Sequence, residues 1–121
     1  MLIEIDVNSE EALYIQLRNQ IIMGIAKSNI QEGDCLPSVR QLADDVGINM
    51  HTVNKAYTVL KQEGFIQLGR RGAVIAIDMN RLQELEHVKQ QLKVVLAKAS
   101  CKGITRDEIH ELVNEIYEDY K

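Results

Sequence analysis

The sequence predicts a mainly α-helical fold, in which three helices and a β-hairpin are followed by two further helices. Three observations lead to this prediction. Apolar residues recur at helical spacing in five segments, the runs "FIQL" and "AVIAI" are joined through "GRRG", and 121 residues suit one compact domain with a short extension. Hydrophobic residues make up 45% of the chain and charged residues 26%, a balance that is typical of globular proteins and argues against long disorder.

The first helix is expected over about residues 10–28. Asn8, followed three residues later by Glu11, predicts a capping box at its start. One face of this helix carries apolar residues at four-residue spacing, namely Leu13, Leu17, Ile21 and Ile25. The polar stretch "SNIQEGD" then predicts a loop.

Two short helices follow, with a glycine between them. Ser38 and Gln41 predict a capping box that opens the first, and Gly47 predicts its end. Its expected buried stripe is Leu42, Ala43 and Val46. Asn49 is the expected N-cap of the second helix, and Gly64 its expected end. The inner face of the second helix is predicted from the spacing of Val53, Ala56, Tyr57 and Leu60.

The outer face of this second helix is polar near its start, where it carries His51, Thr52, Asn54 and Lys55. Two helices joined by a tight turn form a helix-turn-helix, which braces the second helix so that its first residues enter the DNA major groove. Asparagine pairs with adenine, threonine contacts base edges, and Arg40 and Lys55 can neutralise phosphates. The hairpin would be a wing, with Arg70 and Arg71 at its tip able to reach the DNA backbone or a narrow minor groove.

Two more amphipathic helices are predicted after residue 78. Asp78 is the expected cap of the longer one, and Thr105 with Glu108 predicts a capping box for the last. We therefore expect a winged helix-turn-helix domain over residues 1–78 and a helical dimerisation segment over residues 79–121. Two such helices alone cannot enclose a ligand pocket of roughly 300 Å³, but they can bury their apolar stripes across a two-fold axis. The residues expected at the dimer interface are Leu85, Leu92, Leu96, Ile109, Leu112 and Ile116.

Three segments carry a resemblance to a known family: "EGDCLPSVRQLADDVGI", "TVNKAYTVLKQEGFI" and "GRRG". Residues 11–78 resemble the winged helix-turn-helix of the GntR family of bacterial transcription regulators. The wording "TVNKAY" and the two-helix tail are similar to the YtrA-type subfamily. This resemblance implies DNA binding, dimerisation through the small C-terminal part, and repression of transporter operons.

The resemblance places the arginine of the family's "LPSxR" motif at Arg40 and the wing contact at residues 70–72. It places the tip of the recognition helix at Asn49, Met50, His51, Thr52 and Asn54. Many relatives have arginine or another polar residue where this chain has Met50, and "GAV" replaces the wing's usual "GxG". Together with side-chain chemistry, the predicted DNA-contacting residues are Ser38, Arg40, Asn49, Met50, His51, Thr52, Asn54, Lys55, Arg70, Arg71 and Gly72.

The distribution of charge is compatible with this interpretation. The net charge of -4 argues at first against nucleic acid, because phosphate binding requires clustered lysine and arginine. Residues 35–77, however, contain five basic and three acidic residues, whereas the remaining residues contain nine basic and fifteen acidic residues. Basic charge is thus concentrated in the segment with the two short helices.

Other classes of function find little support in the sequence. No apolar run reaches the roughly 20 residues that span a bilayer, and the acidic N-terminus does not resemble a signal peptide, so we expect a cytoplasmic protein without membrane contact. His51, His87 and His110 lie on separate predicted elements, so no metal site is expected. No phosphate-binding glycine loop, nucleophile motif or paired carboxylates indicate an enzyme or a cofactor.

The prediction is a homodimeric, sequence-specific DNA-binding regulator, most simply a repressor that occludes a promoter at an inverted repeat. Its expected partners are double-stranded DNA and a second copy of the chain. Two alternatives remain open: a winged helix used as a protein-interaction module, and an effector-gated sensor with a ligand between its subunits. The sequence names neither an operator nor an effector.

Overall fold

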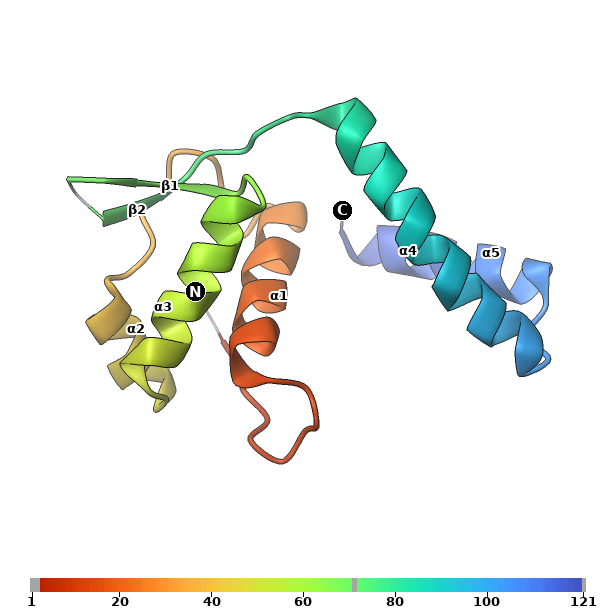
Figure 1. Ribbon diagram of the computed structural model, residues 1–121, viewed down its shortest axis with the longest axis horizontal. Helices are drawn as coiled ribbons and strands as arrows, with labels where there is room; N and C mark the ends of the chain where they lie inside the picture. The colour runs from red at the N-terminus through yellow and green to blue at the C-terminus, as the bar shows by residue number, and fades with distance from the viewer. Residues whose placement is uncertain (1–2, 71, 121) are drawn as a thin grey trace. The chain divides into compact units, whose positions relative to one another are not determined.

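The computed structural model describes residues 3–70 and 72–120. The chain divides into two compact units, Met1–Asp78 and Met79–Lys121, called here the N-terminal unit and the C-terminal unit. The N-terminal unit contains helices α1 (Leu13–Ala26), α2 (Val39–Val46) and α3 (Met50–Gln62), followed by strands β1 (Ile66–Gly69) and β2 (Gly72–Ile75). Helix α1 packs along α3, while α2 lies near the start of α3 and the hairpin follows its end (Figure 1). This is the predicted winged helix-turn-helix.

Helix α1 begins later than expected, and the predicted capping box between Asn8 and Glu11 is wrong. The helix starts at Leu13 without a side-chain cap. The preceding segment is instead held by the buried Gln16, whose Oε1 accepts a hydrogen bond from the Asp6 N–H (2.9 Å) and whose Nε2 donates to the carbonyls of Asp6 (3.0 Å) and Glu11 (2.9 Å). Buried amides require such partners, so this contact determines the path of the chain.

The turn into α2 forms largely as expected. The Ser38 hydroxyl oxygen accepts a hydrogen bond from the Gln41 N–H (3.1 Å), which caps the helix. The second half of the predicted capping box is wrong, because the Gln41 side chain donates to Asp45 Oδ1 (2.7 Å), one turn further along. Gly47 ends the helix in the left-handed conformation (φ 79°), which glycine adopts without the steric cost that a Cβ imposes.

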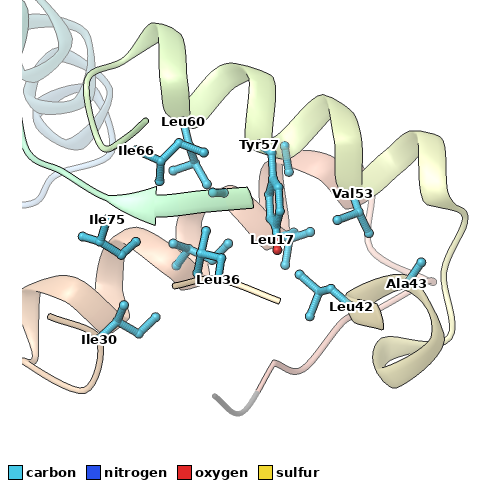
Figure 2. Close-up of a cluster of buried hydrophobic side chains, with 13 residues drawn as sticks. Leu17, Ile30, Leu36, Leu42, Ala43, Val53, Tyr57, Leu60, Ile66 and Ile75 are labelled. Atoms are coloured by element: carbon cyan, nitrogen blue, oxygen red, sulfur yellow. The ribbon is translucent and has the colours of Figure 1, made fainter. Parts of the chain in front are cut away.

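A single hydrophobic core fills the N-terminal unit (Figure 2). The side chains of Val53, Tyr57 and Leu60 extend from one side of α3, as the helical spacing predicted. The other elements contribute buried residues to the same cluster, among them Leu17, Ile21, Leu42, Ala43, Ile66, Ala73 and Ile75. Each large side chain contributes about 1.5–3 kcal/mol through burial, so this core determines which side of α3 faces solvent.

The wing is an antiparallel pair in the register Ile66↔Ile75 to Gly69↔Gly72. The loop before α2 covers the other edge of β2. The Gly33 N–H donates to the Ile75 carbonyl (2.8 Å), and the Leu36 N–H donates to the Ala73 carbonyl (2.9 Å). These bonds attach the wing to the segment that leads into the helix-turn-helix.

The C-terminal unit consists of α4 (Arg81–Cys101) and α5 (Arg106–Asp119). Thr105 and Glu108 form the predicted capping box at the start of α5. The prediction that Asp78 caps α4 is wrong, because the helix begins at Arg81 without a side-chain cap. The Asp78 N–H instead donates to the Gly64 carbonyl (2.7 Å), so this residue closes the N-terminal unit.

Neither α4 nor α5 has a buried residue. Their apolar side chains are exposed in this chain, including Leu85, Leu92, Leu96, Leu112 and Ile116. Among the residues that the structure describes, no helix has the length and apolar character needed to cross a membrane.

Candidate nucleic-acid interface

The start of α3 is defined by its cap. Asn49 has extended backbone angles, and its Oδ1 accepts a hydrogen bond from the His51 N–H (2.7 Å), as predicted for an N-cap. The same side chain was predicted to contact DNA. The cap uses one of the two lone pairs of this oxygen, and the side-chain NH₂ group of Asn49 remains available to a base edge. Asn49 can therefore donate to an acceptor on a base edge while it caps the helix.

The outer face of α3 is polar and accessible. His51, Asn54 and Lys55 are exposed, and Thr52 is half-buried. Met50, in the first helical position, is 45% exposed. Burial of the opposite face in the core holds this surface outward, so the structure brings the predicted residues of α3 together within the first two turns.

Helix α2 presents Arg40 as an exposed side chain. Among the described residues its guanidinium has no hydrogen-bond or ion-pair partner, so its donors are available to a ligand. The position of α2 relative to α3 is held by Tyr57, whose hydroxyl donates to the Pro37 carbonyl (2.7 Å). Burial raises the pKa of Tyr57 to about 12, so the hydroxyl keeps its proton over the physiological range.

The remaining predicted residues differ in how they are placed. Ser38 is exposed, and its hydroxyl oxygen caps α2. Arg70 and Gly72 are exposed at the tip of the wing, whereas Arg71 lies outside the described residues. Gly72 has φ +99°, a conformation that other residues rarely adopt, so the turn favours glycine at this position.

Lys55 has a partner that the sequence did not indicate. Its ammonium nitrogen lies 4.1 Å from the centroid of the Tyr14 ring, a cation–π contact between α3 and the first turn of α1. Beside this pair is an open depression of about 330 Å³ lined by Leu13, Tyr14, His51, Thr52 and Lys55. No sequence signal links Tyr14 to Lys55, because only the packing of α1 on α3 brings them together.

Within residues 3–70 and 72–120, no cluster of three or more histidine, cysteine, aspartate or glutamate side chains could hold a metal ion. His87 lies near Glu84 on α4 (3.9 Å), far along the chain from His51.

Comparisons with known proteins agree with this geometry. Residues 11–75 match the family model described as bacterial regulatory proteins, gntR family. The chain is 35% identical over 124 aligned residues to the HTH-type transcriptional repressor YtrA of Bacillus subtilis strain 168, an alignment that covers 99% of this chain and 95% of that protein.

Solved structures share the fold. A transcriptional antiterminator from Listeria monocytogenes EGD-e has a TM-score of 0.90 at 28% identity, covering 99% of this chain and 92% of its own. YtrA from Sulfolobus acidocaldarius, a GntR-family transcription factor, has a TM-score of 0.61 at 38% identity, covering 97% of each chain. The AraR DBD in complex with operator ORE1 has a TM-score of 0.51 at 26% identity, covering 62% of this chain and 95% of its own.

The matches therefore identify the winged helix-turn-helix as a DNA-binding module and the chain as a transcription regulator rather than an enzyme. Both the fold class and the resemblance inferred from the sequence are confirmed. The chain belongs to the gntR family of bacterial regulatory proteins, and within that family to the YtrA type.

Proposed function

We propose that this regulator is a homodimeric repressor that binds an inverted-repeat operator and blocks access to a promoter. The observation that carries the proposal is the outer face of α3, where polar side chains are exposed over the first two turns on a helix whose opposite face is fully buried. A rigid helix with such a face fits a DNA major groove. The resemblance to YtrA-type regulators extends the proposal to the control of a transporter operon.

The side chains suggest a division of roles. Arg40 and Lys55 are positioned to neutralise phosphates, which adds affinity without sequence preference. His51, Thr52 and Asn54 carry hydrogen-bonding groups that suit base edges. Asn49 and Ser38 would contribute through the groups that their caps leave available. Met50 would meet DNA with an apolar side chain, and residues 70–72 would contact DNA from the wing.

The C-terminal unit supports assembly as a dimer. Leu92 is 45% exposed and Leu112 50% exposed, although both lie on the apolar stripes of their helices. A second copy could cover these stripes, including the predicted interface residues Leu85, Leu96, Ile109 and Ile116. A two-fold dimer would present its two α3 helices to half-sites about one helical turn or more apart, which requires an inverted repeat.

The experiment is selection from a random duplex library with the purified protein, followed by anisotropy titration of the enriched sequence at two salt concentrations. We expect an inverted repeat and a steep salt dependence. Arg40→Ala should weaken binding to all sequences and lower the salt slope by about 1 for each bound protomer. His51→Ala and Asn54→Ala should alter the preferred sequence instead.

Lys27→Ala is the matched control, because it removes an exposed positive charge that lies just after α1, outside the proposed surface. It should bind the selected operator nearly as the parent does. If Arg40→Ala, His51→Ala and Asn54→Ala all bound like the parent, α3 would not be the DNA-reading surface. Failure to enrich any sequence, with no binding even at low salt, would favour the protein-interaction alternative.

A further inference from the structure

The contact between Tyr14 and Lys55 crosses from α1 to the proposed DNA surface. Tyr14 belongs to the first turn of α1 and is half-buried against the core, so its ring is held in place. Lys55 is exposed on α3, with its ammonium nitrogen 4.1 Å from the ring centroid. A fixed aromatic ring therefore faces a lysine whose side chain would otherwise be free to adopt many rotamers.

This arrangement has a consequence for binding. A free lysine loses side-chain entropy when it is immobilised on a ligand, whereas a lysine already held by a ring loses less. The ring contacts only one side of the ammonium group, and lysine has three N–H donors, so donors remain available for an anion. The contact with Tyr14 is thus compatible with simultaneous binding of an oxygen ligand.

The surroundings favour a phosphate in particular. The depression of about 330 Å³ beside the pair is lined by His51, Thr52 and Lys55 together with Leu13 and Tyr14. These residues offer an imidazole, a hydroxyl and an ammonium group, and none of the five carries a carboxylate that would repel an anion. The depression adjoins the outer face of α3, where DNA is proposed to bind.

We infer that Tyr14 is a positioning residue for DNA binding: it holds Lys55 over the depression between α1 and α3, where a phosphate of the operator backbone binds. The inference rests on the proposed function, because it requires α3 to face DNA. It adds a residue of α1 to the interface and places the phosphate contact proposed above for Lys55 at this depression.

The test is a double-mutant cycle on the selected operator, using the full-length parent, Tyr14→Leu, Lys55→Met and the double variant. Lys55→Met should lower the salt slope by about 1 for each bound protomer. Tyr14→Leu should weaken binding about two- to tenfold for each protomer in the parent background, because Lys55 must then lose on binding the side-chain freedom that the ring had already restricted. In the Lys55→Met background, Tyr14→Leu should have no further effect.

Two controls accompany the cycle. Tyr14→Phe keeps the aromatic ring and should bind as the parent does, and Lys27→Met removes a lysine charge away from the depression and should leave affinity nearly unchanged. If Tyr14→Leu weakened binding equally with and without Lys55, the ring would act through packing alone and the inference would be overturned. A parent-like affinity of Tyr14→Leu would overturn it as well.

A spectroscopic measurement on the parent is independent of whether Tyr14→Leu folds. The ring current of Tyr14 should shift the ε-methylene protons of Lys55 upfield, and the shift should persist when operator is added. A return of these protons to the position of a free lysine in the complex would overturn the inference.

The two proposals can fail separately. If Arg40→Ala and His51→Ala also bound operator like the parent, the proposed DNA surface itself would be wrong. If those variants changed binding while the cycle showed no coupling between Tyr14 and Lys55, only the present inference would be overturned.

Discussion

Tyr57 shows how one side chain can serve both the core and the geometry of the binding surface. Its ring is 4% exposed within the cluster of Figure 2, and its hydroxyl reaches the Pro37 carbonyl at the entrance to α2. Helical spacing predicted the burial, because an aromatic residue on the apolar face of α3 belongs in the core. The hydrogen bond adds a second role, since it links α3 to the helix that carries Arg40.

Tyr57→Phe should therefore lower the free energy of unfolding by about 1 kcal/mol, because it leaves the Pro37 carbonyl without this partner. Burial raises the pKa of Tyr57 from its ordinary value of 10.0 to about 12. The folded protein therefore holds the phenolic proton more tightly than the unfolded chain does. The resulting contribution to the free energy of unfolding is fully present below pH 10 and is lost as the pH rises toward 12. Urea unfolding of both proteins at several pH values should show their difference in the free energy of unfolding shrinking above pH 10 and reversing in sign as the pH approaches 12.

The control is Tyr117→Phe, since Tyr117 is 63% exposed on α5 and its loss of a hydroxyl should cost less than about 0.5 kcal/mol. If the difference between the parent and Tyr57→Phe did not change with pH, the tyrosine would not titrate as a buried group.

At the scale of elements, contacts at the ends of α3 determine its position. Arg18 on α1 forms a two-bond ion pair with Glu63 at the C-cap of α3, with Nε–Oε1 and Nη2–Oε2 distances of 2.7 Å. The hydrogen bonds that Arg18 donates to Glu63 raise the pKa of the guanidinium, which remains charged in any case. Because both side chains are partly exposed, water screens the pair, and its contribution is at most about 1 kcal/mol.

Two glycines that end helices provide a matched comparison. Gly47 (φ +79°) and Gly64 (φ +81°) have nearly the same left-handed φ, but a Cβ at Gly47 would meet no atom within 4 Å, whereas one at Gly64 would lie 2.9 Å from Asp78 Cβ. Gly47→Ala should therefore cost only the conformational penalty of about 1–2 kcal/mol. Gly64→Ala should cost about 1 kcal/mol more, because the Asp78 segment must shift.

Urea unfolding of the two variants, fitted with a common slope, measures this difference directly. Equal losses of stability would mean that the segment around Asp78 moves aside without cost, and that its hydrogen bond to Gly64 does not hold the end of the N-terminal unit.

At the scale of the whole molecule, the two units differ in whether they bury their own apolar side chains. The N-terminal unit encloses its own core, whereas α4 and α5 leave their apolar stripes accessible in a single chain. Exposed apolar area of this kind is unfavourable in water and is typical of surfaces through which proteins associate. The dimer proposed above would remove this cost, and the stability of the C-terminal unit would then depend on protein concentration.

Leu92→Asp should convert the dimer into a monomer. Each copy would lose the burial of a leucine, about 1.5–3 kcal/mol, and would place a carboxylate in the interface, so symmetry doubles the effect and weakens dimerisation at least about a hundredfold. Light scattering coupled to size exclusion should give the single-chain mass of 13.8 kDa in place of twice that value.

Gln91→Asp introduces the same group at the neighbouring exposed position of α4 and should leave the dimer intact. If Leu92→Asp remained dimeric, or if both variants dissociated to the same degree, the apolar stripe of α4 would not be the dimer interface.

Much of the fold could be predicted from the sequence, because its signals act between near neighbours. The caps formed by Ser38, Asn49 and Thr105 bond to backbone groups two or three residues further on, so the residue types suffice to predict them. The buried face of α3 follows in the same way from the repeat of apolar residues along one helix. Its polar outer face, and with it the candidate DNA-reading residues, follows from the same periodicity.

The tertiary structure decided the contacts between residues that are distant in the sequence. The predicted caps at Asn8 and Asp78 are wrong because Gln16 and Gly64 hold those segments instead. Packing of α1 on α3 likewise placed Lys55 over Tyr14, which no pattern in either helix indicates. The sequence by itself thus determined the elements and the faces they expose, since these depend on local hydrogen bonds and periodicity. Only tertiary packing decided which side chains on those faces contact residues of another element, because burial of the core brings these distant residues together.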